Sequence, residues 1–467
     1  MPDLIPRKAY HSFLARVLAQ LSNRVTAHYF LVGDLSQRVV DVDIIRQMIA
    51  CIEALNYKCL RYLRQELGQF QVLVGPNASG KSTFLDVIAF IRDLLFAGPD
   101  DAVANRASNS RRLRELVWQG IGNRFELSVE MRIPEHLREK QDAKLPLMCR
   151  YEVAIGNSED DPDPRILVEA LLLLREPAPR PNGQRDMFPV EPKAPETILL
   201  STKQSKARWK TVVKKTEDPG NDYFGSETTG WRTQFRLGPT KSALANLPED
   251  EQKFPVATWA KTFLMGGIES LALESRSIRV PSPRDRGLSL RFDGSNLASV
   301  VKRLQHNQER FQAWIQHIQT ALPDLETVRV NERRQDRTIY LTLVYKHNLR
   351  VPSWLVSDGT LRLLALTVLA YIEPGDATDL IEEPENGIHP QAVQAVFQSL
   401  SSAYRTQVLV ATHSPVFLRL AKPEQVLCFS KTPGGATDVV NGSEHPKLRN
   451  WQGEVSLADF FAAGVLG

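Results

Sequence analysis

The chain has 467 residues, of which 42% are hydrophobic and 24% charged, the composition of an ordinary folded protein with room for two lobes and a large core. No apolar run approaches the ~20 residues that span a bilayer, and no secretory signal is visible near the start. The net charge of +4 comes from 58 basic and 54 acidic residues, a near balance that is compatible with nucleic acid but is weak evidence for it. The four cysteines form no C-x-x-C pair, which indicates thiols in a reducing cytoplasm and predicts neither disulfides nor a zinc site.

Residues 1–47 match no expected element. Tyr10 to Leu21 is amphipathic, so the segment is either a small helical extension or an over-long reading of the start of the chain, and the sequence leaves both open. The first expected strand starts just after Met48, over Ile52 to Leu60.

A glycine-rich stretch follows the apolar run Phe70–Val74 and precedes the amphipathic run Thr83–Leu95. Strand, G-x-x-x-x-G-K-[ST] and helix together predict a phosphate-binding loop. Its glycines let backbone N–H groups turn toward one anion, and the helix N-terminus adds its positive end. Lys81 supplies a charge for the β- and γ-phosphates, and Ser82 a hydroxyl for Mg²⁺. The predicted nucleotide-binding residues here are Gly75, Pro76, Asn77, Ala78, Ser79, Gly80, Lys81, Ser82 and Thr83.

The middle of the chain predicts a β-rich region. Phe125–Ile133 and Arg150–Ile155 alternate apolar and polar residues, which indicates antiparallel strands. Six prolines within residues 176–197 predict a mobile loop. A basic run with one tryptophan follows, and it suits either a strand along a phosphate backbone or a solvated edge strand guarded by lysines. Its residues are Lys203, Lys206, Arg208, Trp209, Lys210, Lys214 and Lys215.

Helical spacing then covers Val256–Leu273 and Asn296–Leu322, and strands are expected over Leu325–Val330 and Thr338–Tyr345. A further helix, Thr360–Ile372, begins at Ser357-Asp358-Gly359-Thr360. The Ser357 hydroxyl and the backbone near Gly359 are suited to face an anion, although serine and aspartate are also ordinary N-cap residues.

Two apolar strands end in chemistry-bearing side chains. The first ends at Glu382 and Glu383; we assign Glu382 to the Mg²⁺ shell beside Ser82, and Glu383 to orienting and deprotonating the attacking water. The second ends about 30 residues later at His413, which is placed to bond the γ-phosphate if it is not a purely structural histidine.

In this order the motifs resemble the ABC-type P-loop ATPases, with Walker A at 75–82, the signature at 357–360, Walker B at 381–383 and the switch histidine at 413. The fragments SDGT, EEPENGIHP and THSP resemble the SMC/RecF/OLD branch and its predicted AAA-type ATPases. About 50 residues follow His413, too few for the C-terminal nuclease domain of OLD-type proteins. Two departures from the transporter pattern stand out: Asp358 replaces a glycine and is expected to cap its own helix, and Glu382 replaces an aspartate.

The resemblance implies an α/β fold with a mixed central sheet flanked by helices, an antiparallel β subdomain and a helical lobe. It places a Mg²⁺- and water-sensing glutamine near Gln119, where a surface glutamine in a turn is the alternative. The expected domains are an N-terminal extension (1–47), an ATPase N-terminal half with the β insertion (48–265), a middle lobe (266–345) and an ATPase C-terminal half (346–467).

The implied activity is hydrolysis of ATP to ADP and phosphate with Mg²⁺, in a cytoplasmic protein that dimerises head to tail around ATP. DNA repair or anti-phage defence is the expected setting, with double-stranded DNA and a separate nuclease or effector as expected partners. An ATP-gated scaffold with little turnover is the alternative. A transporter subunit is disfavoured because about 275 residues separate Walker A from the signature, far more than transporters have.

Overall fold

The computed structural model describes residues 48–108, 113–138, 147–157, 162–174, 185–202, 209–217, 222–284, 287, 289–373, 375–403, 406–448, 456–464 and 466. The expected N-terminal extension lies outside the described residues, as do 203–208 of the basic run and part of the proline-rich segment.

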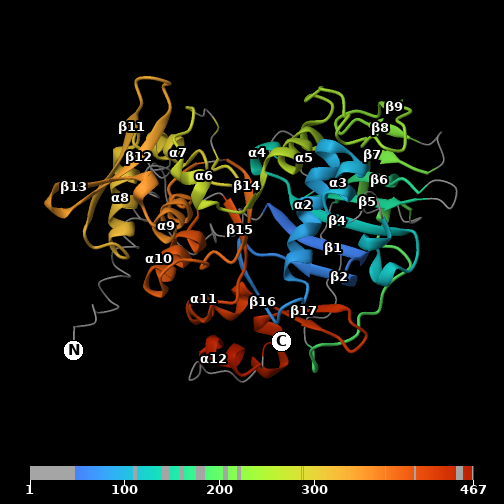
Figure 1. The fold of residues 1–467 in the computed structure, drawn as a ribbon. Coiled ribbons are helices and arrows are strands. Elements are labelled where there is room, and N and C mark those ends of the chain that lie inside the picture. Colours follow the sequence, from blue (N-terminus) through green and yellow to red (C-terminus); the bar gives the residue numbers. More distant parts are fainter. Residues whose placement is uncertain are drawn as a thin grey trace, which may run out of the picture. The chain divides into compact units, whose positions relative to one another are not determined.

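A six-stranded mixed sheet carries the phosphate-binding loop (Figure 1). Its order is β10-β14-β15-β3-β16-β17, and all neighbours are parallel except β16 and β17. The strands are β3 (Phe70–Val74), β10 (Ile268–Leu271), β14 (Ala377–Glu382), β15 (Thr406–Ala411), β16 (Val426–Lys431) and β17 (Thr437–Asn441). Because parallel neighbours end at the same edge, the loop after β3 meets the ends of β14 and β15 there.

Alternate side chains of these strands enter two different cores. Leu73 and Leu409 point into one cluster, whereas Val72 and Val410 point into the other. All five residues of β3 are buried, as expected for a parallel strand that is covered on both faces. Packing on both faces of the sheet therefore holds in place the edge at which the predicted motifs lie.

An eight-stranded antiparallel sheet covers the first core, in the order β2-β1-β4-β5-β6-β7-β8-β9. It contains the two strands expected around Phe125 and Arg150 as neighbours, β4 and β5, and further strands pair with them on both sides. The strands are β1 (Ile49–Tyr57), β2 (Leu60–Glu66), β4 (Arg124–Arg132), β5 (Met148–Gly156), β6 (Arg165–Leu174), β7 (Trp209–Lys215), β8 (Tyr223–Gly225) and β9 (Arg232–Gln234).

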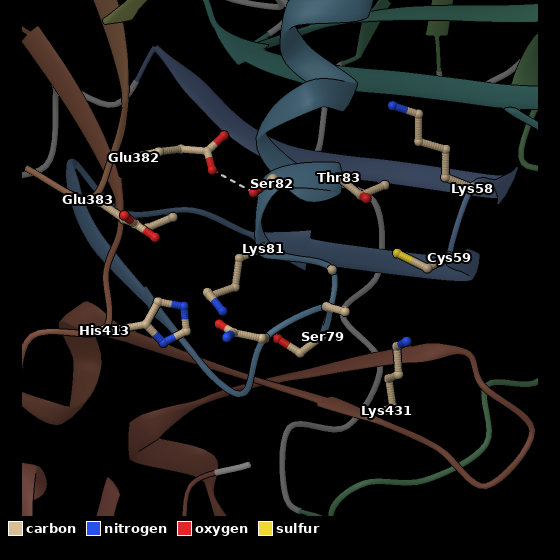
Figure 2. Close-up of a pocket in the computed structure, with 14 residues that line it drawn as sticks. Lys58, Cys59, Ser79, Lys81, Ser82, Thr83, Glu382, Glu383, His413 and Lys431 are labelled. Atoms are coloured by element: carbon tan, nitrogen blue, oxygen red, sulfur yellow. Dashed lines mark hydrogen bonds between the residues drawn. The ribbon is translucent and has the colours of Figure 1, made fainter. Parts of the chain in front are cut away.

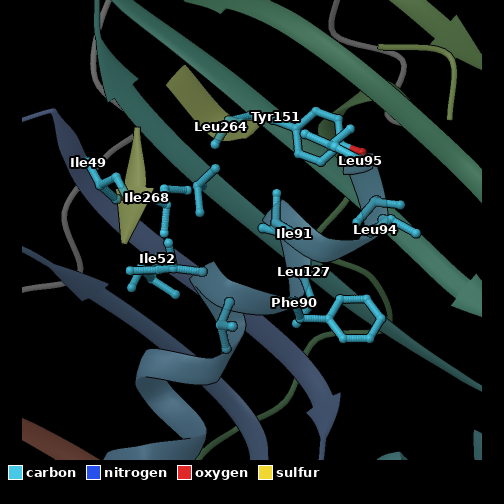
Figure 3. Packing of buried hydrophobic residues seen from close by; sticks show 14 of the residues in the cluster. Ile49, Ile52, Phe90, Ile91, Leu94, Leu95, Leu127, Tyr151, Leu264 and Ile268 are labelled. Carbon is cyan, nitrogen blue, oxygen red and sulfur yellow. The ribbon is translucent and has the colours of Figure 1, made fainter. Parts of the chain in front are cut away.

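Helix α2 (Lys81–Ala97) packs into the core that the two sheets share (Figure 3). Phe90, Ile91 and Leu94 lie on its buried face among Ile52 and Leu127 of the antiparallel sheet. Each such side chain contributes about 1.5–3 kcal/mol when it is fully buried. The helix that begins at the phosphate-binding loop is thereby held along its whole length.

A three-stranded antiparallel sheet, β11 (Leu325–Glu332), β12 (Ile339–Tyr345) and β13 (Leu349–Pro352), belongs to the second core. Its first two strands confirm the sequence expectation. The remaining helices are α3 (Pro99–Ala104), α4 (Glu135–Arg138), α5 (Pro255–Gly266), α6 (Ser275–Arg279), α7 (Leu297–Leu304), α8 (Gln308–Gln319), α9 (Asp358–Val368), α10 (Pro390–Ser401), α11 (Pro415–Leu420) and α12 (Leu457–Ala462).

Three expected helices were too long. The helix predicted over Thr360–Ile372 ends at Val368. The helix predicted to reach Leu273 ends at Gly266, and strand β10 follows. At Gly267 a Cβ would lie 2.9 Å from the Asp376 carbonyl oxygen, so the chain turns where only glycine fits. The helix predicted over 296–322 is two helices, because the Asn307 side chain caps α8 by accepting from the Arg310 N–H.

Candidate functional site

The phosphate-binding loop connects β3 to α2 as predicted. Gly75 has φ 152° and Gly80 has φ 104°, backbone conformations that residues other than glycine rarely adopt. A Cβ at Gly75 would lie 2.3 Å from the Phe429 carbonyl oxygen, and one at Gly80 would lie 2.3 Å from Oγ1 of Thr437. Both glycines are therefore required by backbone conformation and by the close approach of β16 and β17.

Lys81 is the first residue of α2, a helix whose N-cap makes no side-chain hydrogen bond. Its buried Nζ donates to the carbonyl oxygens of Gly75 (2.8 Å) and Pro76 (3.0 Å). Burial lowers the pKa of Lys81, while the Glu382 and Glu383 carboxylates act in the opposite direction. The ammonium group is thus held inside the curl of the loop, where free helix N–H groups also favour an anion.

Ser82 and Glu382 meet at the mouth of the loop. The Ser82 hydroxyl donates to Oε2 of Glu382 at 2.5 Å (Figure 2), although 300 positions separate the two residues in the chain. A hydroxyl and a carboxylate oxygen beside a phosphate site are the hard oxygen donors that Mg²⁺ accepts, with water and phosphate oxygens completing its shell. These two residues fit the predicted metal position.

Glu383 follows β14 with φ 46°, a left-handed conformation that is uncommon for residues other than glycine and costs about 1–3 kcal/mol. Its N–H donates to the Ala411 carbonyl oxygen at 2.8 Å. The turn separates the two neighbouring carboxylates, so that Glu382 reaches Ser82 while Glu383 lies nearer His413 (Figure 2). Such a strained residue at a strand end is typical of a functional position.

His413 follows the end of β15 and is half-buried. Its ring centroid is 6.5 Å from that of Phe461 in α12. Strands β14 and β15 pair with Glu382 opposite Ala411, and β15 pairs with β3 with Ala411 opposite Leu73. This register brings the predicted acids, the histidine and the phosphate-binding loop to one edge of the sheet.

These side chains line one pocket with a volume of about 490 Å³. The sequence prediction missed four of its lining residues. One is Ala411, which directly precedes the Thr412-His413 motif, and the local sequence around the other three carries no motif. Lys58 and Cys59 come from the turn between β1 and β2, and Lys431 ends β16. The lining consists of Lys58, Cys59, Asn77, Ala78, Ser79, Gly80, Lys81, Ser82, Thr83, Glu382, Glu383, Ala411, His413 and Lys431.

Lys58 is held at this pocket by the carboxylate of Asp86. Its Nζ lies 2.6 Å from Oδ2 of Asp86, which also accepts from the Tyr57 hydroxyl at 2.7 Å. Burial would raise the pKa of Asp86, but the charges of Arg106 and Lys58 outweigh burial and lower it. The carboxylate thus stays ionised and fixes the turn between β1 and β2.

The signature residues lie outside the pocket. Neither Ser357 nor Gly359 is among the described residues that line the pocket. The Ser357 side chain caps α9 by accepting from the Thr360 N–H at 3.3 Å. The expectation that Asp358 caps this helix is wrong: Ser357 has the extended backbone of an N-cap, and Asp358 forms an ion pair with Arg279 at 2.7 Å.

Gln119 also lies outside the described lining of the pocket. It is exposed, has φ 51°, and its amide donates to the Gly434 carbonyl oxygen at 3.3 Å. Gly434 belongs to the turn of the β16–β17 hairpin, which also carries Lys431. The role of Gln119 toward Mg²⁺ and water therefore stays a prediction, and in this structure the side chain bonds backbone.

The described part of the basic run is strand β7, which lies inside its sheet. Strand β7 pairs with β6 from Trp209 to Lys215 and with β8 at Val213 and Lys214, so the edge-strand interpretation is wrong for residues 209–215. Lys215 is buried and its Nζ donates to the carbonyl oxygens of Gly238 (2.9 Å) and Lys241 (2.7 Å). Burial lowers its pKa. The Lys210 ammonium donates to the Glu227 carbonyl oxygen at 2.6 Å, so both lysines hold loops.

The family described as "AAA domain, putative AbiEii toxin, Type IV TA system" matches residues 70–136 and 223–419. This is more than half of the chain. The protein belongs to this family. The match confirms the predicted AAA-type P-loop ATPase, and it spans the phosphate-binding loop, both acids and the histidine.

No curated protein matches the sequence. Three similar solved structures are SMC heads. An SMC head bound to the C-terminal winged-helix domain of ScpA is 14% identical, with 84% of this chain and 97% of that chain covered and a TM-score of 0.49. The Pyrococcus furiosus head bound to ScpA is 13% identical, with coverages of 84% and 96% and a TM-score of 0.46. The Thermotoga maritima head is 9% identical, with 84% and 98% covered and a TM-score of 0.38.

The predicted fold class is confirmed by the α/β architecture itself, a mixed sheet with the phosphate-binding strand β3 inside it, an antiparallel sheet and a helical lobe. Within the described part of the chain, no helix is long and apolar enough to cross a membrane. All four cysteines are free thiols, and three of them are buried.

Proposed function

We propose that the protein hydrolyses ATP to ADP and phosphate in this pocket. The observation that carries the proposal is the contact between Ser82 and Glu382 at 2.5 Å, directly beside Glu383 and His413 in a pocket that Lys81 enters. A phosphate cradle, a pair of oxygen donors for a metal, a carboxylate and an imidazole are the parts that phosphoryl transfer to water requires.

Each residue has a proposed role. The loop N–H groups and Lys81 hold the β- and γ-phosphates, and Ser82 and Glu382 hold Mg²⁺. The metal supplies positive charge against the oxygens of the transferred phosphoryl group. Glu383 orients the attacking water and accepts its proton, while His413 donates a hydrogen bond to the γ-phosphate.

The second part of the proposal is a head-to-tail dimer that closes around two ATP molecules. Ser357 and Gly359 lie outside the pocket of their own chain, yet the start of α9 presents the N-terminus of an eleven-residue helix. Such an N-terminus favours an anion, and the γ-phosphate of a partner's ATP fits this requirement. Hydrolysis would then reopen the dimer, a two-state element biased by the γ-phosphate.

We further propose a cytoplasmic role in genome maintenance or anti-phage defence, with a separate effector protein. The description of the family includes a toxin of a type IV TA system, which supports the defence setting. Double-stranded DNA is the proposed trigger. The second candidate is an ATP-gated scaffold for a partner nuclease, and Glu383 beside His413 favours turnover over pure scaffolding.

The test is ATP hydrolysis by the purified protein with and without double-stranded DNA, with Lys81→Ala as the blank. We expect turnover above the blank and stimulation by DNA. A wild-type rate equal to that of the blank contradicts the enzymatic proposal and favours the scaffold. Turnover that DNA leaves unchanged contradicts the proposed trigger and points to a protein partner.

A further inference from the structure

The loop between β14 and α10, residues 383–389, contacts two motifs that lie far apart in the sequence. Its internal hydrogen bonds run from the Asn386 N–H to the Glu383 carbonyl oxygen (2.9 Å) and from the Ile388 N–H to the Glu385 carbonyl oxygen (3.0 Å). These bonds make the loop one compact turn. A displacement of one of its residues therefore displaces the others.

On one side, Glu385 holds the residues at the end of β15. Its Oε1 accepts from the Thr412 hydroxyl at 2.6 Å and from the His413 N–H at 3.2 Å. The Thr412 hydroxyl oxygen in turn accepts from the Ser414 N–H at 2.9 Å, and both Thr412 and Ser414 are buried. The carboxylate therefore fixes the backbone that aims His413 at the pocket.

The second oxygen of Glu385 is buried, and among the described residues it has no hydrogen-bond partner. A buried carboxylate oxygen without a donor costs free energy, so local packing alone does not explain a glutamate here.

On the other side, the same loop seats the signature helix. The Arg362 guanidinium of α9 donates from Nη1 to the Asn386 carbonyl oxygen at 2.8 Å. A Cβ on Gly359 would lie 2.4 Å from the Gly387 carbonyl oxygen. Gly359 thus permits a backbone contact between the start of α9 and the loop, and any movement of residues 385–387 has to move the signature with it.

We propose that Glu385 is a positioning residue that couples His413 to the signature helix of the same chain. This inference rests on the proposed function, in which His413 faces the chain's own ATP whereas Ser357 and Gly359 face the ATP of the partner. Glu385 acts through Thr412 and the His413 backbone rather than by touching nucleotide. The loop joins the state of one ATP site to the surface that completes the other.

Hydrogen exchange tests the coupling without requiring turnover. ATP is added, with Mg²⁺, to protein diluted until sedimentation shows a single chain, so that no partner covers α9. In the wild type we expect slower exchange in two segments, 411–418 and 357–366. In Glu385→Ala the change at 411–418 remains and the change at 357–366 disappears. Equal protection of both segments in the variant would overturn the proposal.

Steady-state kinetics give the second readout. Removing the Glu385 carboxylate should lower kcat about tenfold and leave KM within about twofold, because a misaimed His413 loses transition-state contacts but not ATP binding. Glu385→Gln keeps the shape and should fall between wild type and alanine, which guards against a folding defect. Glu326→Gln, at an exposed glutamate of β11, is the matched control and should match the wild type.

A double-mutant cycle separates coupling from local structure. Arg362→Met keeps an unbranched apolar stem but removes the bond to Asn386. If the effect of Arg362 passes through Glu385, the double variant is no slower than Glu385→Ala alone. Effects that simply multiply would show that the two residues act independently and would refute the coupling. A wild type that binds ATP without turnover contradicts the proposed function, whereas the exchange experiment still decides this inference.

Discussion

Two regions of the molecule contain glutamates beside basic side chains. The regions differ in whether the protein itself occupies the hydrogen-bond acceptors of those glutamates. In the antiparallel sheet, Arg150 donates to Glu53 (2.8 Å), Glu130 (2.8 Å) and Glu152 (3.0 Å), as well as to the Ile198 carbonyl oxygen (2.9 Å). In the pocket, Glu382 and Glu383 are exposed.

The difference separates structure from chemistry. The buried cluster satisfies its charges internally: burial alone would lower the pKa of Arg150, but the surrounding carboxylates hold it above its ordinary value. The pocket carboxylates keep lone pairs for groups that arrive from outside, and Glu383 sits in a strained backbone conformation. Carboxylates whose hydrogen bonds are all made within the protein serve the fold, whereas carboxylates with free acceptors are available to bind ligands and react.

The largest expected effect tests the pocket side of this comparison. Glu383→Gln removes the proposed proton acceptor and should lower kcat by about 100-fold or more. Binding of ATP should stay near the wild-type affinity, and the variant should accumulate as an ATP-bound dimer. Turnover assays, equilibrium binding and sedimentation check these outcomes. A variant that hydrolyses ATP at the wild-type rate would show that another group accepts the proton.

Arg150→Met tests the opposite side. Removing the buried arginine leaves Glu53 and Glu130 with Arg64 alone and Glu152 without its ion-pair partner, which should cost about 3–5 kcal/mol in the free energy of unfolding. ATP affinity at a temperature where the variant is folded should not change. The control is Lys346→Met: Lys346 and its ion-pair partner Asp324 at 2.9 Å are both exposed, and such a pair is worth about 0–1 kcal/mol. Equal losses in the two variants, measured by denaturant unfolding, would contradict the comparison.

Ser357→Ala tests whether the pocket is completed by a second chain. Turnover should fall about tenfold through the lost phosphate contact, and stability by about 1 kcal/mol through the lost N-cap. Mixing this variant with Lys81→Ala should restore part of the activity, because one intact composite site forms per mixed dimer. Without any recovery on mixing, the head-to-tail arrangement would be wrong.

The last test concerns Asp379, a buried carboxylate that belongs to neither region. Burial, and then the neighbouring Glu269, raise the pKa of Asp379 to about 7. The folded state therefore binds more protons than the unfolded state between about pH 4 and pH 7, and stability contributed by this group is lost as pH rises through that window. Asp379→Asn should raise Tm at pH 8 and raise it by less at pH 5. A Tm difference that does not depend on pH would contradict this assignment.

Local sequence was sufficient to locate the motifs that consist of consecutive residues. The phosphate-binding loop, the paired acids and His413 each follow an apolar strand as predicted, and parallel strands of one sheet end at one edge, while their chemical roles stay proposals. Lys58 and Lys431 were missed because only tertiary structure brings their turns to the pocket. Asp358 was misassigned because the neighbouring Ser357 competes for the same cap, and the sequence does not indicate that Arg279 pairs with the aspartate.

The phosphate-binding loop depends on strands that are synthesised long after it. The Thr437 hydroxyl of β17 donates to the Ser79 carbonyl oxygen at 2.9 Å across 358 positions of the chain, and the Phe429 backbone lies against Gly75. Most of the polypeptide is therefore synthesised before β16 and β17, the strands that support the phosphate-binding loop, are available. Nascent chains with the complete Walker A sequence lack a finished phosphate cradle until β16 and β17 pair, so this site is completed late in the synthesis of the protein.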